Sequence, residues 1–285
     1  SPVNNSVFQP GTIVYLNVFG STRLNVSLNG GPWVEHLAPF EIDTDVGSDG
    51  PNTLDVNSTN ANGTSIASFE FTIDSVGPEI VLVSPAEGSK VRVGRILDFN
   101  VTDDNLASVN YTNGASSINM TAPFDVDTAG WPNGLVAVTV KAVDLAGNIA
   151  TEIFSFDFDG IKPTVSSVTP ANGSMSVRVD SQLAIQFSEP MNESAAESAL
   201  SITPAVGFGA FTWNTGATQL SVTLSANMTQ NTRYRVSVST LAKDAVGNAM
   251  NSTYRWEFTT WLDTDGDGLP NNHDQDDDGD GQMDG

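Results

Sequence analysis

The strongest constraint on the fold is an internal repeat, spaced by about 84 residues in the first half of the chain. Three pairs of segments match: SPVNNSVFQPGTIVYLNV at 1–18 with SPAEGSKVRVGRILDFNV at 84–101, APFEIDT at 38–44 with APFDVDT at 122–128, and FEFTID at 69–74 with FSFDFD at 154–159. The order of the segments is kept while the offset drifts by single residues. We therefore infer two copies of one fold that differ in the lengths of their loops.

A third unit follows, since VTPANGS resembles the earlier VSPAEGS and KDAVGNAMNSTYRWEFTT resembles VDLAGNIATEIFSFDFD. The last two segments share Asp-x-x-Gly-Asn and then a closing strand. We place boundaries near Val76 and Ile161, where the short linkers DSVGP and DGIKP end in proline and favour an extended connection. The predicted units are 1–76, 77–161 and 162–261, followed by an acidic segment at 262–285.

Within each unit, apolar residues alternate with polar ones. The alternating sets that share one face are Leu183, Ile185 and Phe187; Tyr234, Val236 and Val238; Val136, Val138 and Val140; and Tyr254, Trp256 and Phe258. Half-buried strands separated by Gly, Asn and Pro turns predict an all-β fold of antiparallel β-sandwiches. One segment, NESAAESAL, predicts a short helix with Asn192 as its N-cap and Glu193 in its first turn.

The third unit resembles the Ig-like domain of bacterial S-layer proteins. The resemblance lies in KPTVSSVTPANGSMSVRVDSQLAIQFSEPMN, TRYRVSVSTLAKDAVGNAM and WEFTT, over roughly 162–261. Through AVDLAGN and a terminal F-x-F pattern, the first two units resemble the Ig-like repeats of prokaryotic surface proteins and adhesins. The resemblance implies three tandem Ig-like sandwiches in an extracellular stalk, adhesin, S-layer or spacer, with no chemistry of their own.

The segment DTDGDGLPNNHDQDDDGDGQMDG carries nine aspartates and no lysine or arginine. Such charges repel one another, so the segment is either a disordered acidic tail or a binding site for a cation. Its spacing matches the calcium loop that takes oxygens from positions 1, 3, 5, 7, 9 and 12, with Gly268 at position 6. The predicted ligands are Asp263, Asp265, Asp267, the carbonyl of Leu269, Asn271 and Asp274.

A second set of the same spacing consists of Asp276, Asp278, Asp280, the carbonyl of Gln282, and Asp284. Its twelfth position would lie beyond Gly285, and we expect the natural protein to continue. The segment resembles thrombospondin type 3 repeats and the aspartate-rich calcium repeats of prokaryotic surface proteins. Ligands that are all oxygen favour Ca²⁺ over soft metals, and Mg²⁺ dehydrates too reluctantly for such a cage.

Four other aspartates flank the linkers or follow a predicted strand: Asp74, Asp103, Asp104 and Asp159. Two interpretations are open for them. They share calcium ions between neighbouring units, or they are ordinary polar turn residues.

Sugar-acceptor sequences N-x-[ST] occur at eleven asparagines: Asn4, Asn25, Asn57, Asn62, Asn100, Asn110, Asn119, Asn172, Asn192, Asn227 and Asn251. Strand alternation predicts that four of these side chains, at Asn25, Asn100, Asn110 and Asn119, point outward. The pattern indicates either glycosylation, which favours a secreted archaeal or eukaryotic chain, or simply a polar strand face. A helix cap at Asn192 conflicts with a sugar there.

The composition excludes several classes of function. The net charge of −23 argues against binding to nucleic acid or to an anionic membrane surface. No apolar run has the roughly 18 residues of a membrane helix, so no direct membrane insertion is expected in these residues. The chain has no cysteine, and its two histidines, His36 and His273, lie far apart without metal-ligand spacing.

No catalytic motif is present, and acid pairs such as Glu35 and Glu41 are interpreted as surface residues. The sequence thus predicts a non-enzymatic, extracellular or cell-surface structural protein stabilised by Ca²⁺. The alternatives are a spacer or a carbohydrate-binding region of a larger secreted hydrolase. Self-association through edge strands, and binding to other surface proteins or glycans, are further expectations.

Overall fold

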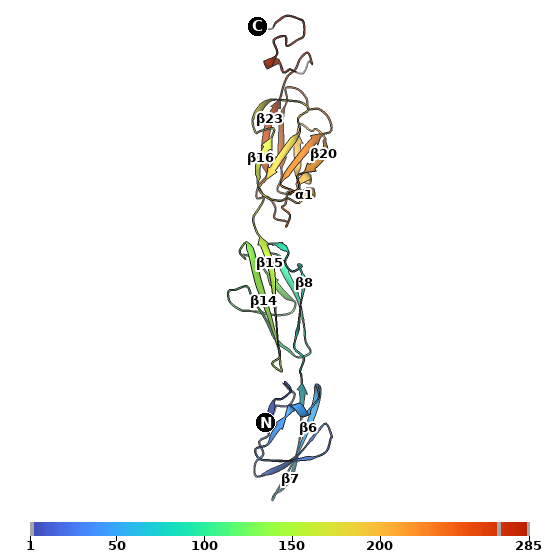
Figure 1. Cartoon of the computed structure of the whole chain (residues 1–285), viewed down its shortest axis with the longest axis vertical. Coiled ribbons are helices and arrows are strands. Elements are labelled where there is room, and N and C mark those ends of the chain that lie inside the picture. Colours follow the sequence, from blue (N-terminus) through green and yellow to red (C-terminus); the bar gives the residue numbers. More distant parts are fainter. Residues whose placement is uncertain (1–2, 267–268, 284–285) are drawn as a thin grey trace. The chain divides into compact units, whose positions relative to one another are not determined.

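The computed structural model describes residues 3–266 and 269–283, and nearly all of its regular structure is β-strand (Figure 1). The chain divides into two compact units, one of Ser1–Ser89 with Gly94–Asp157 and the other of Lys90–Val93 with Phe158–Gly285. Each sheet takes its strands from one of the three sequence repeats. The tandem β-sandwich architecture is confirmed, while the boundaries near Val76 and Ile161 stay a prediction.

The first repeat forms a five-stranded sheet of order β1-β7-β6-β3-β4 and a two-stranded sheet of β2 and β5. Its strands are β1 (Ser6–Phe8), β2 (Ile13–Tyr15), β3 (Arg23–Leu28), β4 (Val34–Leu37), β5 (Glu41–Asp43), β6 (Gly50–Asn60) and β7 (Gly63–Ile73), with a 3-10 turn η1 (Thr44–Val46). Leu24, Leu54 and Ile73 are fully buried between the sheets.

The second repeat packs a three-stranded sheet, β13-β10-β8, against a five-stranded sheet, β12-β11-β14-β15-β9. Its strands are β8 (Glu79–Ser84), β9 (Lys90–Arg92), β10 (Ile96–Thr102), β11 (Leu106–Thr112), β12 (Ile118–Met120), β13 (Phe124–Asp127), β14 (Gly134–Asp144) and β15 (Ile149–Asp159). The predicted inward set Val136, Val138 and Val140 is buried.

The third repeat has two four-stranded sheets, β16-β18-β21-β20 and β17-β23-β22-β19. Its strands are β16 (Val165–Thr169), β17 (Ser174–Val177), β18 (Leu183–Phe187), β19 (Leu200–Thr203), β20 (Phe208–Trp213), β21 (Gln219–Leu224), β22 (Arg233–Val238) and β23 (Tyr254–Thr260). A 3-10 turn, η2 (Asn271–His273), follows in the acidic segment.

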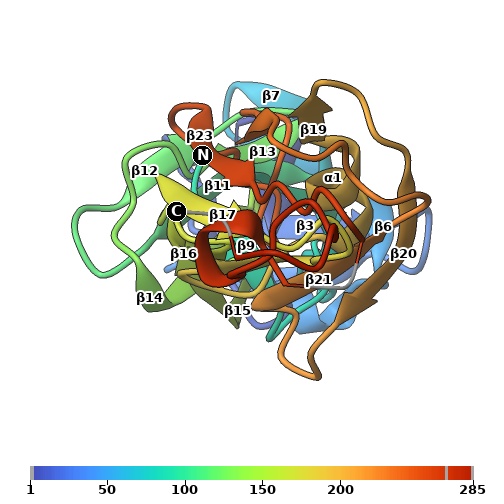
Figure 2. The same ribbon diagram turned by 90° about the horizontal axis from the view of Figure 1, so that it is seen from above.

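The single α-helix of the described residues is α1 (Glu193–Ser198), within the segment where the sequence predicts it. Asn192 caps it, because its side-chain oxygen accepts a hydrogen bond from the N–H of Ala195 at 3.0 Å. The helix lies beside the end of β20 (Figures 1 and 2), where the indole N–H of Trp213 donates to Glu197 at 2.9 Å.

The predicted inward faces of the third repeat are confirmed. Leu183, Ile185 and Phe187 are buried, and so are Tyr234, Val236, Val238, Trp256 and Phe258, while the predicted inward residue Tyr254 is half-buried. The prediction of purely antiparallel sheets is wrong at two edges, since β1 pairs with β7 and β17 pairs with β23 in parallel. Both are short strands near the start of their repeat, and each pairs along the last strand of the same repeat.

Candidate cation sites

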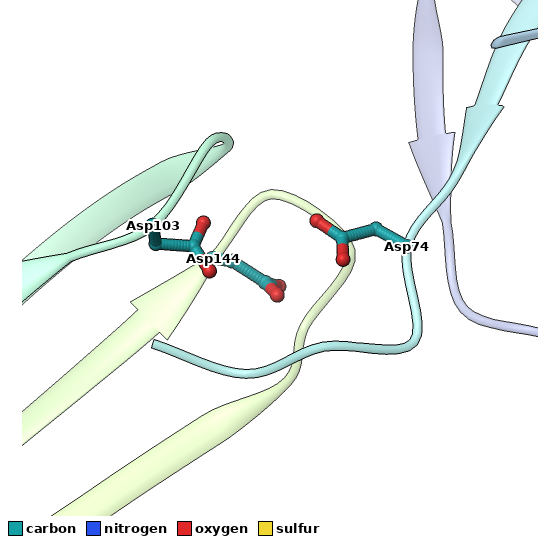
Figure 3. A group of neighbouring side chains, drawn as sticks. All are labelled: Asp74, Asp103 and Asp144. Carbon is teal, nitrogen blue, oxygen red and sulfur yellow. The ribbon is translucent and has the colours of Figure 1, made fainter. Parts of the chain in front are cut away.

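Three carboxylates meet where the last strand of the first repeat leads into the second repeat (Figure 3). Asp74 directly follows β7, Asp103 directly follows β10, and Asp144 is the last residue of β14. Each offers an oxygen within 4.8 Å of the others. Two oxygens on opposite sides of a Ca²⁺ ion lie about 4.8 Å apart, since each Ca–O distance is about 2.4 Å. The three oxygens are therefore close enough together to contact one calcium ion.

The Asp-x-x-Gly-Asn loop holds this cluster in place. One oxygen of Asp144 accepts from the N–H groups of Gly147 and Asn148 at 2.6 and 2.8 Å. The other accepts from the side-chain amide of Asn148 at 2.7 Å. That amide also donates to the backbone carbonyl of Asp74 at 2.9 Å, and the amide of Asn105 donates to the Asp74 carboxylate at 2.8 Å. The loop thus fixes the carboxylate of Asp144 and, through Asn148, the backbone of Asp74 at the start of the linker.

The same arrangement recurs in the second unit, between Asp159, Glu189 and Asp244. Asp244 accepts from the backbone N–H groups of three following residues, at 2.7 to 3.0 Å, and from the side-chain amide of Asn248 at 2.8 Å. Asn248 also donates to the carbonyl of Asp159 at 3.0 Å. In both loops the asparagine amide thus bonds the loop aspartate and a backbone carbonyl at the start of the linker.

Burial, and to a smaller extent repulsion between the carboxylates, raises the pKa of one acid in each cluster. Burial raises the pKa of Asp103, and the charges of Asp144 and Asp74 add to the shift. Burial likewise raises the pKa of Glu189, with contributions from Asp159 and Asp244. A divalent cation among these oxygens would relieve the repulsion, because it favours the charged form of every carboxylate around it.

The two clusters differ in one respect. The ammonium of Lys90 lies 2.8 Å from a carboxylate oxygen of Asp159. Burial opposes ionisation of Asp159, but the hydrogen bonds from Lys90 and from the N–H of Ile161 outweigh it and lower the pKa of Asp159. One oxygen of Glu189 is buried without a hydrogen-bond partner, so the site still has an acceptor to offer. These oxygens suit a hard cation such as Ca²⁺.

The sequence predicts only part of each cluster. Asp74, Asp103 and Asp159 were considered for shared calcium, and the structure places all three in the clusters, whereas Asp104 is exposed and outside them. Asp144 and Asp244 were used only as markers of the repeat. The recurrence of Asp-x-x-Gly-Asn after each linker was the signal that could have identified them.

The acidic segment brings together only part of the predicted ligand set. Asp276, Asp278 and Asp280 offer oxygens within 4.8 Å of one another, and one oxygen of Asp276 is buried without a hydrogen-bond partner. In the described residues, Asp263, Asp265 and Asp274 form no such group. The predicted ligands Asp267 and Asp284 lie outside the described residues.

Three further predicted ligands are Asn271, Leu269 and Gln282. The side-chain oxygen of Asn271 accepts from the N–H of Thr264 at 2.9 Å, while its amide donates to the Thr264 hydroxyl at 2.7 Å. Leu269 is exposed, as is Gln282, whose N–H donates to Asp280 at 2.8 Å. Among the described residues, three carboxylates of the second predicted set, which starts at Asp276, lie close together.

The acceptor asparagines lie at the surface. Asn25, Asn100 and Asn119 are exposed on their strands as the alternation predicts, and Asn110 is half-buried. The seven others comprise half-buried Asn57 and exposed Asn4, Asn62, Asn172, Asn192, Asn227 and Asn251.

We expect glycans in the native protein at Asn25, Asn100, Asn110 and Asn119 more often than at Asn192. The first four lie on strand faces, whereas the Asn192 side chain is held by the N–H of Ala195 and by the Ser194 hydroxyl. Mass spectrometry of intact glycopeptides measures the occupancy of each site. Bare asparagine at all four strand sites, or preferential modification of Asn192, would contradict the expectation.

The sequence of residues 159–260 matches the family model of a bacterial Ig-like domain. The match begins at Asp159 of the second cluster and includes Glu189 and Asp244, and it bears out the predicted Ig-like character of the third repeat. No curated protein sequence matches the chain. The described part of the chain has no helix with the length and apolar character of a membrane span.

Several solved structures resemble the chain in fold. Fibronectin(III)-like modules of Clostridium thermocellum CbhA share 14% identity over 56% of this chain and 92% of theirs, with a TM-score of 0.37. An I-band fragment of titin shares 11% identity over 90% of this chain and 94% of the fragment, with a TM-score of 0.42. The human desmocollin-1 ectodomain shares 9% identity over 93% of this chain and 61% of that one, with a TM-score of 0.35. These likenesses concern the β-sandwich fold alone.

Proposed function

We propose that this chain is a non-catalytic, extracellular structural region whose Ig-like modules serve as a stalk or spacer at a cell surface. Domains of the matched bacterial Ig-like family are typically extracellular and non-catalytic, which supports the general class. The specific role would be that of a stalk, adhesin, S-layer or filament subunit. Further copies or surface glycans would be its partners, reached through edge strands such as β4 and β12.

Calcium would act in this region by fixing the segments that lead from one repeat to the next. The observation that carries this proposal is the repeated constellation of a linker aspartate, a strand-end acid and an Asp-x-x-Gly-Asn loop. A cation bound there would tie the linker carboxylate to two elements of the following repeat. If Ca²⁺ binds only the folded state, a free Ca²⁺ concentration of 100 times Kd raises the free energy of unfolding by about 2.7 kcal/mol.

The test is a calorimetric titration of the whole chain with Ca²⁺. The unmodified chain is compared with two variants at neighbouring positions. Asp103→Asn should weaken binding at the first cluster at least tenfold, because it removes one negative charge and one ligand from the site. Asp104→Asn removes the same charge one residue away, from an exposed side chain outside the cluster, and should change binding less than threefold.

Magnesium at the same concentration should give a much smaller heat and a smaller thermal shift. Equal losses in the two variants would mean that general acidity, rather than a built site, attracts the ion. No calcium response in the unmodified chain would remove calcium from the proposal and leave a metal-independent stalk.

A further inference from the structure

The aspartates that begin the two linkers, Asp74 and Asp159, are held by closely similar bonds. One carboxylate oxygen of each accepts from the backbone N–H two residues later, that of Val76 at 3.1 Å and that of Ile161 at 2.9 Å. The backbone carbonyl of each accepts from the asparagine amide of its Asp-x-x-Gly-Asn loop. The two linkers differ at the second carboxylate oxygen.

This second oxygen has an uncharged donor in the first linker and a charged one in the second. At Asp74 it accepts from the side-chain amide of Asn105 at 2.8 Å, whereas at Asp159 it lies 2.8 Å from the ammonium of Lys90. Within the described residues, no lysine or arginine forms an ion pair with the three acids of the first cluster (Figure 3). In this part of the chain, the second cluster therefore contains a cation and the first does not.

Lys90 reaches Asp159 because of its register on the parallel strand β15. The N–H of Asp157 donates to the carbonyl of Ser89 at 3.2 Å, and the N–H of Val93 donates to the carbonyl of Asp159 at 3.0 Å. Lys90 therefore lies opposite Asp157, two residues before Asp159 and on the same face of the sheet.

The matching position in the first repeat is Val7. It lies opposite Thr72 in the parallel pair of β1 and β7, two residues before Asp74. The sequence aligns the same two positions, since SPAEGSK ends at Lys90 and SPVNNSV ends at Val7. A single residue thus decides whether the linker aspartate has a cation beside it.

The second cluster needs such a cation because its charges are buried. Asp159 and Asp244 are 6% and 2% exposed, and water therefore screens their charges poorly. The Lys90 side chain is 53% exposed, so its ammonium keeps part of its hydration while it contacts the buried carboxylate. Desolvation thus costs this pair less than a pair in which both charges are buried.

We propose that Lys90 is a built-in cation that holds the second linker, residues 159–163, without a bound metal. The first linker, residues 74–78, has valine at the matching position and would depend on a dissolved cation such as Ca²⁺. This second part rests on the calcium role proposed above. Calcium would then control the first linker alone, since a divalent ion at the second cluster would be repelled by the ammonium already there.

Hydrogen exchange of the whole chain, resolved by NMR, measures each linker through its own amide. The N–H of Val76 reports on the first linker and the N–H of Ile161 on the second. With a chelator, the Ile161 amide should be protected at least tenfold more than the Val76 amide, relative to their rates in an unfolded chain. Saturating Ca²⁺ should slow exchange at Val76 at least tenfold and at Ile161 less than threefold.

Lys90→Gln should speed exchange of the Ile161 amide at least tenfold in the presence of the chelator. Ca²⁺ should then restore most of the protection, because the variant leaves three acids without a cation beside them. Lys141→Gln is the matched control, since it makes the same change at an exposed position of β14 that forms no ion pair among the described residues. We expect it to change exchange at Ile161 less than twofold.

Val7→Lys is the reciprocal test, because it places the ammonium beside the first linker. Val7 is half-buried and does not pack against the core of the first repeat, so the site has room for a longer side chain. With the chelator, this variant should protect the Val76 amide at least fivefold and reduce the further effect of Ca²⁺ to less than threefold. Val7→Gln lengthens the side chain without a charge and should give no such protection.

The outcomes separate this inference from the proposed function. Equal effects of Lys90→Gln and Lys141→Gln on the Ile161 amide would overturn the role of Lys90, whatever calcium does. Equal protection of both amides by Ca²⁺ in the unmodified chain would support the proposed function and contradict this inference. If Ca²⁺ protects neither amide while Lys90→Gln still exposes Ile161, the calcium role fails and Lys90 stands as the cation of the second linker.

Discussion

Asp244→Ala is expected to lower the unfolding free energy of the third repeat by about 3 kcal/mol, measured in the presence of a chelator. Asp244 is 2% exposed, and its carboxylate accepts four hydrogen bonds from its own loop. Alanine would leave three backbone N–H groups and the Asn248 amide without this acceptor. The chelator ensures that the loss reflects the loop itself and no bound cation.

Hydrogen exchange of β22 and β23 measures this loss in the repeat that contains the variant. Asp244→Asn should cost less, about 1.5 kcal/mol, because its carbonyl can still accept from the backbone while its amide faces the amide of Asn248. Asp180→Ala is the control, since Asp180 is exposed and its carboxylate pairs with Arg178 at 2.9 Å. It should lower the unfolding free energy far less than Asp244→Ala does, because exposed ion pairs contribute little to stability. An equal effect of Asp244→Ala and Asp180→Ala would show that the loop bonds contribute little.

The strand pattern of the third repeat could be predicted because burial there follows the alternation of residues. Leu183, Ile185 and Phe187 are inward in the sequence pattern and buried in the structure. The helix could be predicted because its signal is local, with Asn192 ahead of a run of helix-forming residues. The parallel edges of β1 and β17 could not, because three or four residues carry no signal for the partner strand that they join.

The acid clusters, too, could be predicted from the sequence only in part. Asp144 and Asn148 are four residues apart, and their bond is implied by the Asp-x-x-Gly-Asn motif. Asp103 lies opposite them only because β10 and β14 belong to two packed sheets. Glu189 lies two residues after β18, and its approach to Asp159 depends on the same packing of sheets. Spacing within one loop is visible in a sequence, whereas proximity between loops requires the fold.

In the acidic segment, the spacing of aspartates predicts two ligand sets, and in the described residues three carboxylates of the second set lie together. Gly279 and Gly281 adopt φ angles of +71° and +86°, which glycine tolerates and other residues rarely adopt. The N–H of Gly281 donates to Asp276 at 2.9 Å, and the N–H of Asp280 donates to Asp278 at 3.1 Å. These turns gather the carboxylates of Asp276, Asp278 and Asp280.

Saturating Ca²⁺ is therefore expected to slow hydrogen exchange of the amides at 278–282 at least tenfold, and a chelator should reverse the effect. The ion would link three carboxylates that otherwise repel one another, and the intervening backbone would lose its freedom to open. Asp278→Asn should abolish most of the protection, because it removes a carboxylate from the cluster. Magnesium at the same concentration should protect far less, because it gives up its water reluctantly.

Asp277→Asn is the matched control, because it removes the same charge from the neighbouring residue, which is outside the cluster. We expect it to retain protection within a factor of two to three. If both variants lose protection equally, the segment attracts calcium by charge density alone, without a defined set of ligands. If calcium changes no exchange rate in the unmodified chain, the segment is an acidic tail without a calcium site. The difference between these neighbouring residues thus separates coordination from general acidity, since their electrostatic contribution to the segment is nearly the same.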